Sequence, residues 1–343
     1  MKRSALQREL AAVAIAVLAT IAIGSVLMMI AGKVPGRVWL DMVTRTGSSA
    51  YAMADVLYKA TAIALCGLSV SIALDAGLFN LGVEGQLTAG VLACAVVGAA
   101  LPAGTPAVIA IPLCTLAAAA AGAAIGGLLG LLRVTRDAHE VITSFMFNSI
   151  VVGVALWIGS ATLFQNGTTT GPPIVAGAEL PTLGIGGSSV NAAALLAVAA
   201  IAGVWWLRAR TTWGHALRAV GRDPAAARAV GISVGRVQIA VMIGSGALAG
   251  LSATNFVMGH KHAFEDGLGR GVGLLGVSAA LVGRLHPVGV ALAALGLGFL
   301  SAAGLAVGDE VPKELTEMLQ GVLLLAIAVG VPFVKRAARK VPA

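Results

Sequence analysis

Residues 76–86 read AGLFNLGVEGQ, and the three polar side chains Asn80, Glu84 and Gln86 lie here between two long apolar stretches. Three glycines share the segment, and glycine weakens a helix, so a helix break is expected rather than a continuous helix. In lipid, a carboxylate costs at least about 2.5–3.5 kcal/mol, and a broken backbone is tolerated only where protein or water satisfies it. The stretch therefore predicts a break that faces protein or a water-filled path.

The composition of the chain predicts a membrane protein. Of its 343 residues, 58% are hydrophobic and 11% are charged, whereas soluble domains carry about 25% charged residues. The apolar runs reach about 20 residues and lack the alternation of barrel strands. We therefore expect an all-α fold, a polytopic transmembrane helical bundle.

About ten membrane segments are expected, some of them broken or re-entrant. The segment 271–283 is too short for a full crossing, which takes about 20 residues. The first segment lacks a clear signal-peptide cleavage site and is interpreted as a retained helix. The expected segments are 10–31, 59–77, 81–101, 107–132, 141–163, 190–208, 237–258, 271–283, 286–307 and 317–334.

The distribution of basic residues predicts the orientation. With the N-terminus inside, most of the 23 lysines and arginines fall in inner segments, as the positive-inside rule requires. The loop 164–189 has no lysine or arginine and is expected outside, whereas 208–236 carries six arginines and is expected inside. Both termini are then cytoplasmic. Only 32–59, with four basic residues outside, departs from the rule.

The inner loop 208–236 contains a helix start signal. Asp223 can cap a helix that begins with Pro224, and Gly231 can end it. A short helix over 224–230 would suit docking of a soluble motor protein. The alternative is an ordinary basic loop that only fixes topology.

Two sequence stretches resemble a known family. ALRAVGRDPAAARAVGISVGR, followed by SGALAGLSA at 245–253, is similar to the coupling segment of permeases from bacterial binding-protein-dependent ABC importers. The branch is the superfamily for branched-chain amino acids, simple sugars and nucleosides. AGLFNLGVEGQ resembles the signature of its nucleoside type, paired with basic-membrane-protein lipoproteins, although Leu81 replaces the usual isoleucine. The stretch 269–287 resembles a third family motif but departs from it at Leu274 and Val277-Ser278. The resemblance covers about residues 60–330.

The resemblance implies a function and a set of partners. The chain, as a single permease domain over 1–343, would form half of a membrane core in the bacterial inner membrane. It would work with ABC ATPase subunits, a second homologous permease and an extracytoplasmic solute-binding lipoprotein, and carry nucleosides or related purine and pyrimidine compounds. ATP and Mg²⁺ would bind the ATPase, so no cofactor, metal or nucleic acid is expected on this chain.

Two groups of residues are assigned on this basis. The residues expected to dock the ATPase are Gly221, Arg222, Asp223, Pro224, Arg228 and Gly231. Those expected to line the substrate path are Asn80, Glu84, Gln86 and Asn148. Two structural alternatives stay open: Glu84 could accept hydrogen bonds from the broken backbone, and Asn148 could make an interhelical hydrogen bond.

Other function classes are less well supported. The chain has no GxxxxGK[ST] motif, and the GxGxxG over 271–276 follows no strand, so neither an ATPase nor a dinucleotide site is expected. No HExxH or similar catalytic constellation appears. A sugar or branched-chain amino acid importer is the first alternative, and an ion-coupled secondary transporter the second. Cys66, Cys94 and Cys114 lie in apolar runs and are expected in the core.

Overall fold

The computed structural model describes residues 18–164, 168–185, 187–312, 314–322 and 325–326, and almost all regular structure in it is helical. Among these residues, seven helices are long and apolar enough to cross a membrane. Leu18–Ile30 and Pro35–Gly47 meet at a 116° bend and add an eighth crossing if the pair counts as one span. The predicted polytopic helical bundle is confirmed.

The elements follow one another along the chain with few strands between them. The helices are α2 (Pro35–Gly47), α3 (Ala50–Asp75), α4 (Val83–Ala100), α5 (Ala107–Arg136), α6 (Glu140–Ile158), α7 (Ala193–Arg210), α8 (Thr212–Arg222), α9 (Pro224–Ala229), α10 (Val234–Leu251), α11 (Ala253–Phe256), α12 (Val272–Val282) and α13 (Pro287–Ala306). Shorter pieces are the π-helical turns η1 (Gly159–Leu163) and η3 (Val257–Lys261), the 3₁₀ turn η2 (Ala176–Ala178), and the strands β1 (Thr170–Pro173) and β2 (Ala263–Glu265), which pair antiparallel.

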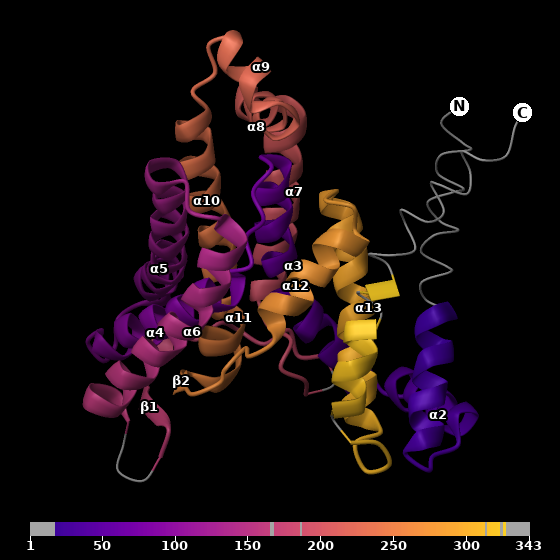
Figure 1. Cartoon of the computed structure of the whole chain (residues 1–343). Coiled ribbons are helices and arrows are strands. Elements are labelled where there is room, and N and C mark those ends of the chain that lie inside the picture. The colour runs from indigo at the N-terminus through magenta and orange to yellow at the C-terminus, as the bar shows by residue number, and fades with distance from the viewer. Residues whose placement is uncertain (1–17, 165–167, 186, 313, 323–324, 327–343) are drawn as a thin grey trace, which may run out of the picture.

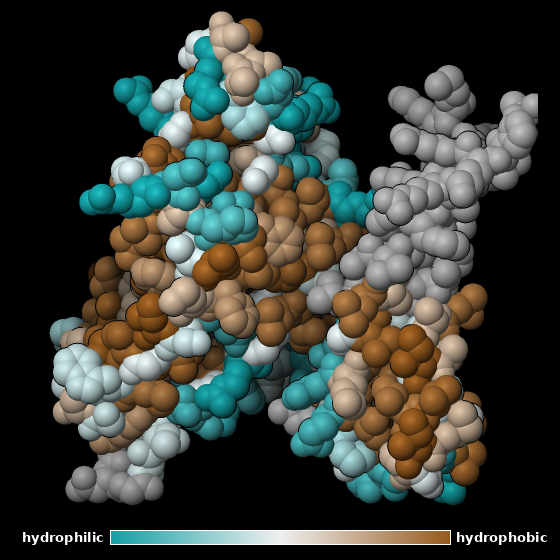
Figure 2. Space-filling model, in the orientation of Figure 1, coloured by the Kyte–Doolittle hydropathy of each residue, from teal (hydrophilic) through white to brown (hydrophobic). Residues whose placement is uncertain are grey.

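The bundle has two polar ends and an apolar middle. Helices α8 and α9 lie at one end, and β1 and β2 lie at the opposite end (Figure 1). A hydrophobic belt separates hydrophilic residues at the two ends (Figure 2). Trp205, Trp206 and Trp213 are about half exposed around the start of α8, as expected of side chains at a membrane–water boundary.

Helix α3 is the centre of the fold. Along its apolar window, 89% of the residues are buried, and it packs against α7, α10, α12 and α13. The largest core cluster joins α3 to α4, α5 and the segment around β2, and it contains Cys66, Cys94 and Cys114. All three cysteines are free and buried, which confirms their predicted place in the core.

The described residues place a helix at every predicted membrane segment, and the largest difference in a boundary is at the start of α3. Residues 10–17, 323–324 and 327–334 of the predicted first and last segments lie outside the described residues. Helix α3 begins at Ala50 rather than at residue 59, because Ser49 caps it by accepting a hydrogen bond from the backbone N–H of Ala52 at 3.1 Å. Helix α2 was not predicted; its buried Val38 and Met42 pack in a core cluster with Met28 and Leu319.

Three of the four basic residues of 32–59, which departed from the positive-inside rule, are ion-paired: Arg37, Arg45 and Lys59. Arg45 contacts Asp309 at 2.9 Å and also pairs with Glu310. Lys59 lies 3.9 Å from Asp55, one helical turn away. The Arg45 contacts join α2 to the residues that follow α13, and the ion pairs together explain how this end of the bundle accommodates the positive charge.

Small residues allow α5 and α10 to pack with their backbones in contact. A Cβ on Gly122 would overlap the carbonyl oxygen of Gly246, and a Cβ on Gly250 would overlap that of Ala118. A Cβ on Gly126 would overlap the carbonyl of Met242 in the same way. These small residues therefore serve packing within the chain, as expected for helices in lipid.

We predict that Gly122→Ala lowers the stability of the protein by about 1–3 kcal/mol, because the added methyl group must push two backbones apart. Gly153→Ala in α6 is the matched control, since a Cβ there meets nothing within 4 Å. The control should be neutral or slightly stabilising, because alanine favours a helix over glycine. The midpoint of thermal unfolding in detergent measures both variants. Equal midpoints for the two would contradict the packing argument.

Candidate functional site

The predicted break lies between α3 and α4 and is held by an amide network. The backbone is non-helical from residue 77 to 82, with a left-handed turn at Gly77 (φ +75°). Asn80 accepts a hydrogen bond from the N–H of Gly82 at 2.9 Å, and its Nδ2 donates to Gln86 Oε1 at 2.9 Å and to Ser245 Oγ at 2.8 Å. Asn80 and Gln86 are fully buried, and their side-chain amides hydrogen-bond to each other. Asn80 also binds a backbone N–H group that the helix break leaves without a helical partner.

Asn148 from α6 completes the same network. Its Nδ2 donates to the carbonyl oxygen of Leu81 at 2.8 Å, and its Oδ1 accepts from the N–H of Gly85 at 2.8 Å. The N–H of Leu81 donates to Ser144 Oγ at 3.1 Å. Side chains of α6 thus take the place of the helical hydrogen bonds that the break removes, a role that matches the interhelical alternative for Asn148.

Glu84 binds the start of α12. Its Oε1 accepts from the N–H of Gly271 at 2.5 Å, and its Oε2 accepts from the N–H of Gly273 at 2.8 Å. A Cβ on Gly273 would lie 2.6 Å from Oε2, so glycine is required for this approach. The carboxylate satisfies N–H groups that the first helical turn leaves free, and it complements the positive end of the helix dipole.

Helix α12 is the short segment anticipated from the sequence. Its 11 residues extend about 16 Å at 1.5 Å per residue, roughly half of a hydrocarbon core of about 30 Å. Its N-terminal groups need a partner inside the bundle, and Glu84 is that partner.

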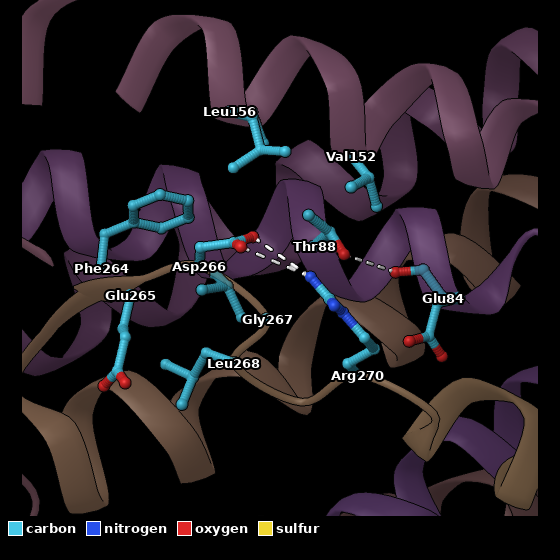
Figure 3. Close-up of a pocket in the computed structure, with 12 residues that line it drawn as sticks. Glu84, Thr88, Val152, Leu156, Phe264, Glu265, Asp266, Gly267, Leu268 and Arg270 are labelled. Carbon is cyan, nitrogen blue, oxygen red and sulfur yellow. Dashed lines mark hydrogen bonds and ion pairs between the residues drawn. The ribbon is translucent and has the colours of Figure 1, made fainter. Parts of the chain in front are cut away.

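A pocket opens beside Glu84, between α4, α6 and the segment that precedes α12 (Figure 3). Arg270 lies between Asp266 and Glu84, with its Nη2 3.4 Å from Asp266 Oδ1. The remaining lining is Thr88, Val91, Val152, Ala155, Leu156, Phe264, Glu265, Gly267 and Leu268. The pocket has a volume of about 30 Å³, which is room for about one or two water molecules, and its walls combine apolar side chains with carboxylate and guanidinium groups.

The structure thus separates the four residues predicted for the path. Glu84 lines the pocket, and it also holds the start of α12. Asn80, Gln86 and Asn148 are not among the residues that line this pocket. Their side chains form the hydrogen-bond network that holds the helix break. The sequence missed Thr88, Asp266 and Arg270; the signal available was a cluster of charges, FEDGLGRG, at 264–271 between two apolar segments.

At the α8–α9 end, the local helix signals are confirmed. Asp223 Oδ1 accepts from the N–H groups of Ala225 at 2.8 Å and Ala226 at 3.1 Å, and α9 begins with Pro224. Gly231 follows the helix with a φ of +84°. The preceding helix, α8, was not predicted.

The six residues predicted to dock an ATPase divide into two sets. Arg222, Asp223, Pro224, Arg228 and Gly231 are exposed, whereas Gly221 turns inward. A Cβ on Gly221 would overlap the carbonyl oxygen of Asp75 at the end of α3. Pro224 and Arg228 also line a groove beneath α9, with Arg133 and Asp137 at the end of α5 on its other side.

An ion pair that the sequence did not predict lies beneath α8, between Arg208 and Asp75. Arg208 Nε lies 2.7 Å from Asp75 Oδ2, and the side chains are 17% and 8% exposed. A second bond joins Arg208 Nη2 to Asp75 Oδ1 at 2.9 Å. Both residues end apolar runs that the topology places on one side, which is the only sequence signal that could have paired them.

Known transporter proteins are similar to this chain over most of its length. The family described as branched-chain amino acid transport system, permease component, matches residues 52–328. The glucose ABC transporter permease protein TsgB13 of Haloferax volcanii is 32% identical and covers 90% of this chain and 84% of its own length. The guanosine ABC transporter permease protein NupP of Bacillus subtilis is 32% identical, and the match covers 92% of this chain and 91% of the length of NupP. The nucleoside ABC transporter permease protein NupB of Lactococcus lactis is 28% identical, and the match covers 90% of this chain and 87% of the length of NupB.

We predict that Glu84→Gln lowers the free energy of unfolding by about 1–3 kcal/mol, because the amide can accept from only one of the two N–H groups and leaves a buried donor unsatisfied. Glu265→Gln is the control, since Glu265 also lines the pocket but pairs with the exposed Lys261 at 2.8 Å. Yield from the membrane and the unfolding midpoint in detergent measure the effect. Wild-type stability with altered transport would instead assign Glu84 to the path alone.

Proposed function

The chain belongs to the family of branched-chain amino acid transport system permease components, and from this premise we propose that it moves nucleosides or related purine and pyrimidine compounds across the membrane. It is a multi-pass ABC transporter permease. In the proposed importer, a partner ATPase binds ATP and Mg²⁺, a second permease completes the core, and an extracytoplasmic binding protein delivers the solute. The chain itself binds no cofactor in this scheme.

The observation that carries the coupling proposal is the exposed α8–α9 surface. Its charged residues Arg222, Asp223 and Arg228 are exposed, and the end of the molecule at α8 and α9 is largely hydrophilic (Figure 2). The groove beneath α9 has a volume of about 540 Å³ and adds Pro224 and Arg228 to this surface. We propose that this surface is cytoplasmic because the segment 208–236, which contains it, carries six arginines, in line with the positive-inside rule.

The proposed solute is polar and uncharged, and alternating access must widen the pocket beside Glu84 to admit it. Carboxylates of Glu84, Glu265 and Asp266 can then accept hydrogen bonds from hydroxyl groups, and the apolar side chains of α6 can cover a flat ring. The motif AGLFNLGVEGQ favours nucleosides. The glucose permease relative favours a sugar, which is the second candidate, because its identity to this chain equals that of the guanosine permease.

The proposed mechanism is alternating access. ATP binding brings the partner ATPases together and displaces the α8–α9 surface. The membrane helices then change their packing around the path, and the solute leaves on the cytoplasmic side. The permease needs only weak affinity, since the solute must be released.

We predict that the double variant Arg222→Ala/Asp223→Ala inserts normally but loses most solute uptake. Removing the Asp223 cap should destabilise α9 by about 1 kcal/mol, and the exposed charges are lost with it. Co-purification of the ATPase and uptake in proteoliposomes measure the effect. Arg236→Ala, an exposed arginine at the start of α10, is the control. Full uptake in the double variant would remove the docking assignment.

We also predict that the assembled importer takes up labelled guanosine and that unlabelled nucleosides compete, whereas glucose does not. The carboxylates alone would accept either solute, so the competition separates the two candidates. An ATPase-inactive complex is the control for passive binding. Competition by glucose and not by nucleosides would overturn the nucleoside proposal.

A further inference from the structure

Helix α12 is held at both ends by charged side chains from other parts of the chain. Glu84 of α4 accepts the N–H groups of Gly271 and Gly273 at its start. Arg208 of α7 donates from Nη1 to the carbonyl oxygen of Leu285, in the turn that follows its end. A carboxylate at the N-terminus and a guanidinium at the C-terminus are the charges that a helix dipole favours.

Arg208 also joins this turn to the other helices of the α8 end. Its guanidinium forms the two-point ion pair with Asp75 at the end of α3. Its backbone carbonyl accepts a hydrogen bond from Arg218 Nη1 of α8 at 2.5 Å. One residue therefore contacts α3, α8 and the α12–α13 turn.

Helix α8 has little freedom to move without these partners. A Cβ on Gly214 would lie 2.7 Å from Arg208 Cα, and a Cβ on Gly221 would lie 3.0 Å from the backbone nitrogen of Gly77. The two glycines lie two turns apart on the buried face of α8, with Leu217 between them. Displacement of α8 must therefore be passed to the ends of α3 and α7.

We propose that Arg208 is a positioning residue for transport, which passes displacement of the α8–α9 surface to α12 and so to Glu84 at the pocket. The inference rests on the proposed function, because it requires that an ATPase moves α8–α9. It adds a defined route: α8, Arg208 with Asp75, the Leu285 turn, α12, and Glu84.

The route requires an arginine. A guanidinium has five donors in a fixed plane and can bind the Asp75 carboxylate and the Leu285 carbonyl together. A lysine keeps the positive charge and can pair with Asp75, but its single ammonium group cannot hold both in this geometry. Arg208→Lys therefore separates the charge from the link to α12.

The test compares Arg208→Lys with Arg210→Lys in the complete importer reconstituted in proteoliposomes. Arg210 lies two residues after Arg208 at the same helix end, is exposed, and makes no hydrogen bond or ion pair with the described residues. Three quantities are measured: ATPase co-purification, ATP hydrolysis, and labelled guanosine uptake per ATP hydrolysed. We expect Arg208→Lys to keep the ATPase bound and hydrolysing while uptake per ATP falls about tenfold, and Arg210→Lys to match wild type.

The outcomes separate this inference from the proposed function. Loss of ATPase binding in wild-type protein, or no uptake by it, would refute the proposed function. An unchanged ratio of uptake to hydrolysis in Arg208→Lys, including an equal fall of both, would show that Arg208 is only structural. Asp75→Asn is the second variant; it is isosteric and should lower the ratio in the same direction.

A second measurement leaves Arg208 and Asp75 unchanged, so it tests the proposal even where neither variant folds. Spin labels at His215 on α8 and Leu274 on α12, both exposed, report the distance between these helices. The native cysteines are buried and should not react. We expect this distance to stay constant between nucleotide-free and ATP-trapped states, while the distance from Leu274 to Ile150 on α6 changes. A changed α8–α12 distance would overturn the proposal.

Discussion

The carboxylate of Glu84 on the first N–H groups of α12 is the interaction on which the centre of the fold depends. Each partner would be unstable in the membrane without the other: a carboxylate that lacks donors is expensive in lipid, and so is a helix that starts inside the bundle with free N–H groups. Glu84 belongs to α4, which itself begins after a break. Two interrupted segments, 187 residues apart in sequence, thus satisfy each other.

This contact is possible because small residues let the helices approach closely. Gly273 has no side chain, so the Glu84 carboxylate reaches the backbone. The same principle operates at Gly122 and Gly246, where α5 and α10 touch backbone to backbone. In a bilayer, where apolar side chains gain little by leaving lipid, such close packing must hold the bundle together. The abundance of glycine is thus a structural requirement of the polar centre as well as of the helix contacts.

The sequence predicted those features whose signals are local. Apolar runs located the membrane helices, the glycines of AGLFNLGVEGQ located the break, and Asp223 with Pro224 located α9. It did not predict partners distant in the chain. Nothing near Glu84 shows that Gly271 and Gly273 will bind it, and nothing near Asp75 points to Arg208. Helix α8 was not predicted because its buried face includes Gly214. The reason for a glycine there is its close contact with the backbone of α7, which the sequence does not show.

Helix α3 connects the α8–α9 end of the bundle with α12, the two regions that the proposed function requires. At its end, the backbone around Asp75 and Gly77 is covered by Gly221 of α8; along its length, Cys66 lies directly against Gly276 of α12. Because α3 is almost wholly buried, it cannot shift without moving both neighbours. Among the described residues, the exposed side chains of Arg222 and Arg228 make no hydrogen bond or ion pair within the chain, whereas Glu84 and Arg208 bind the two ends of the α12 segment. In the proposed mechanism, burial therefore separates the charges that receive a displacement from those that transmit it.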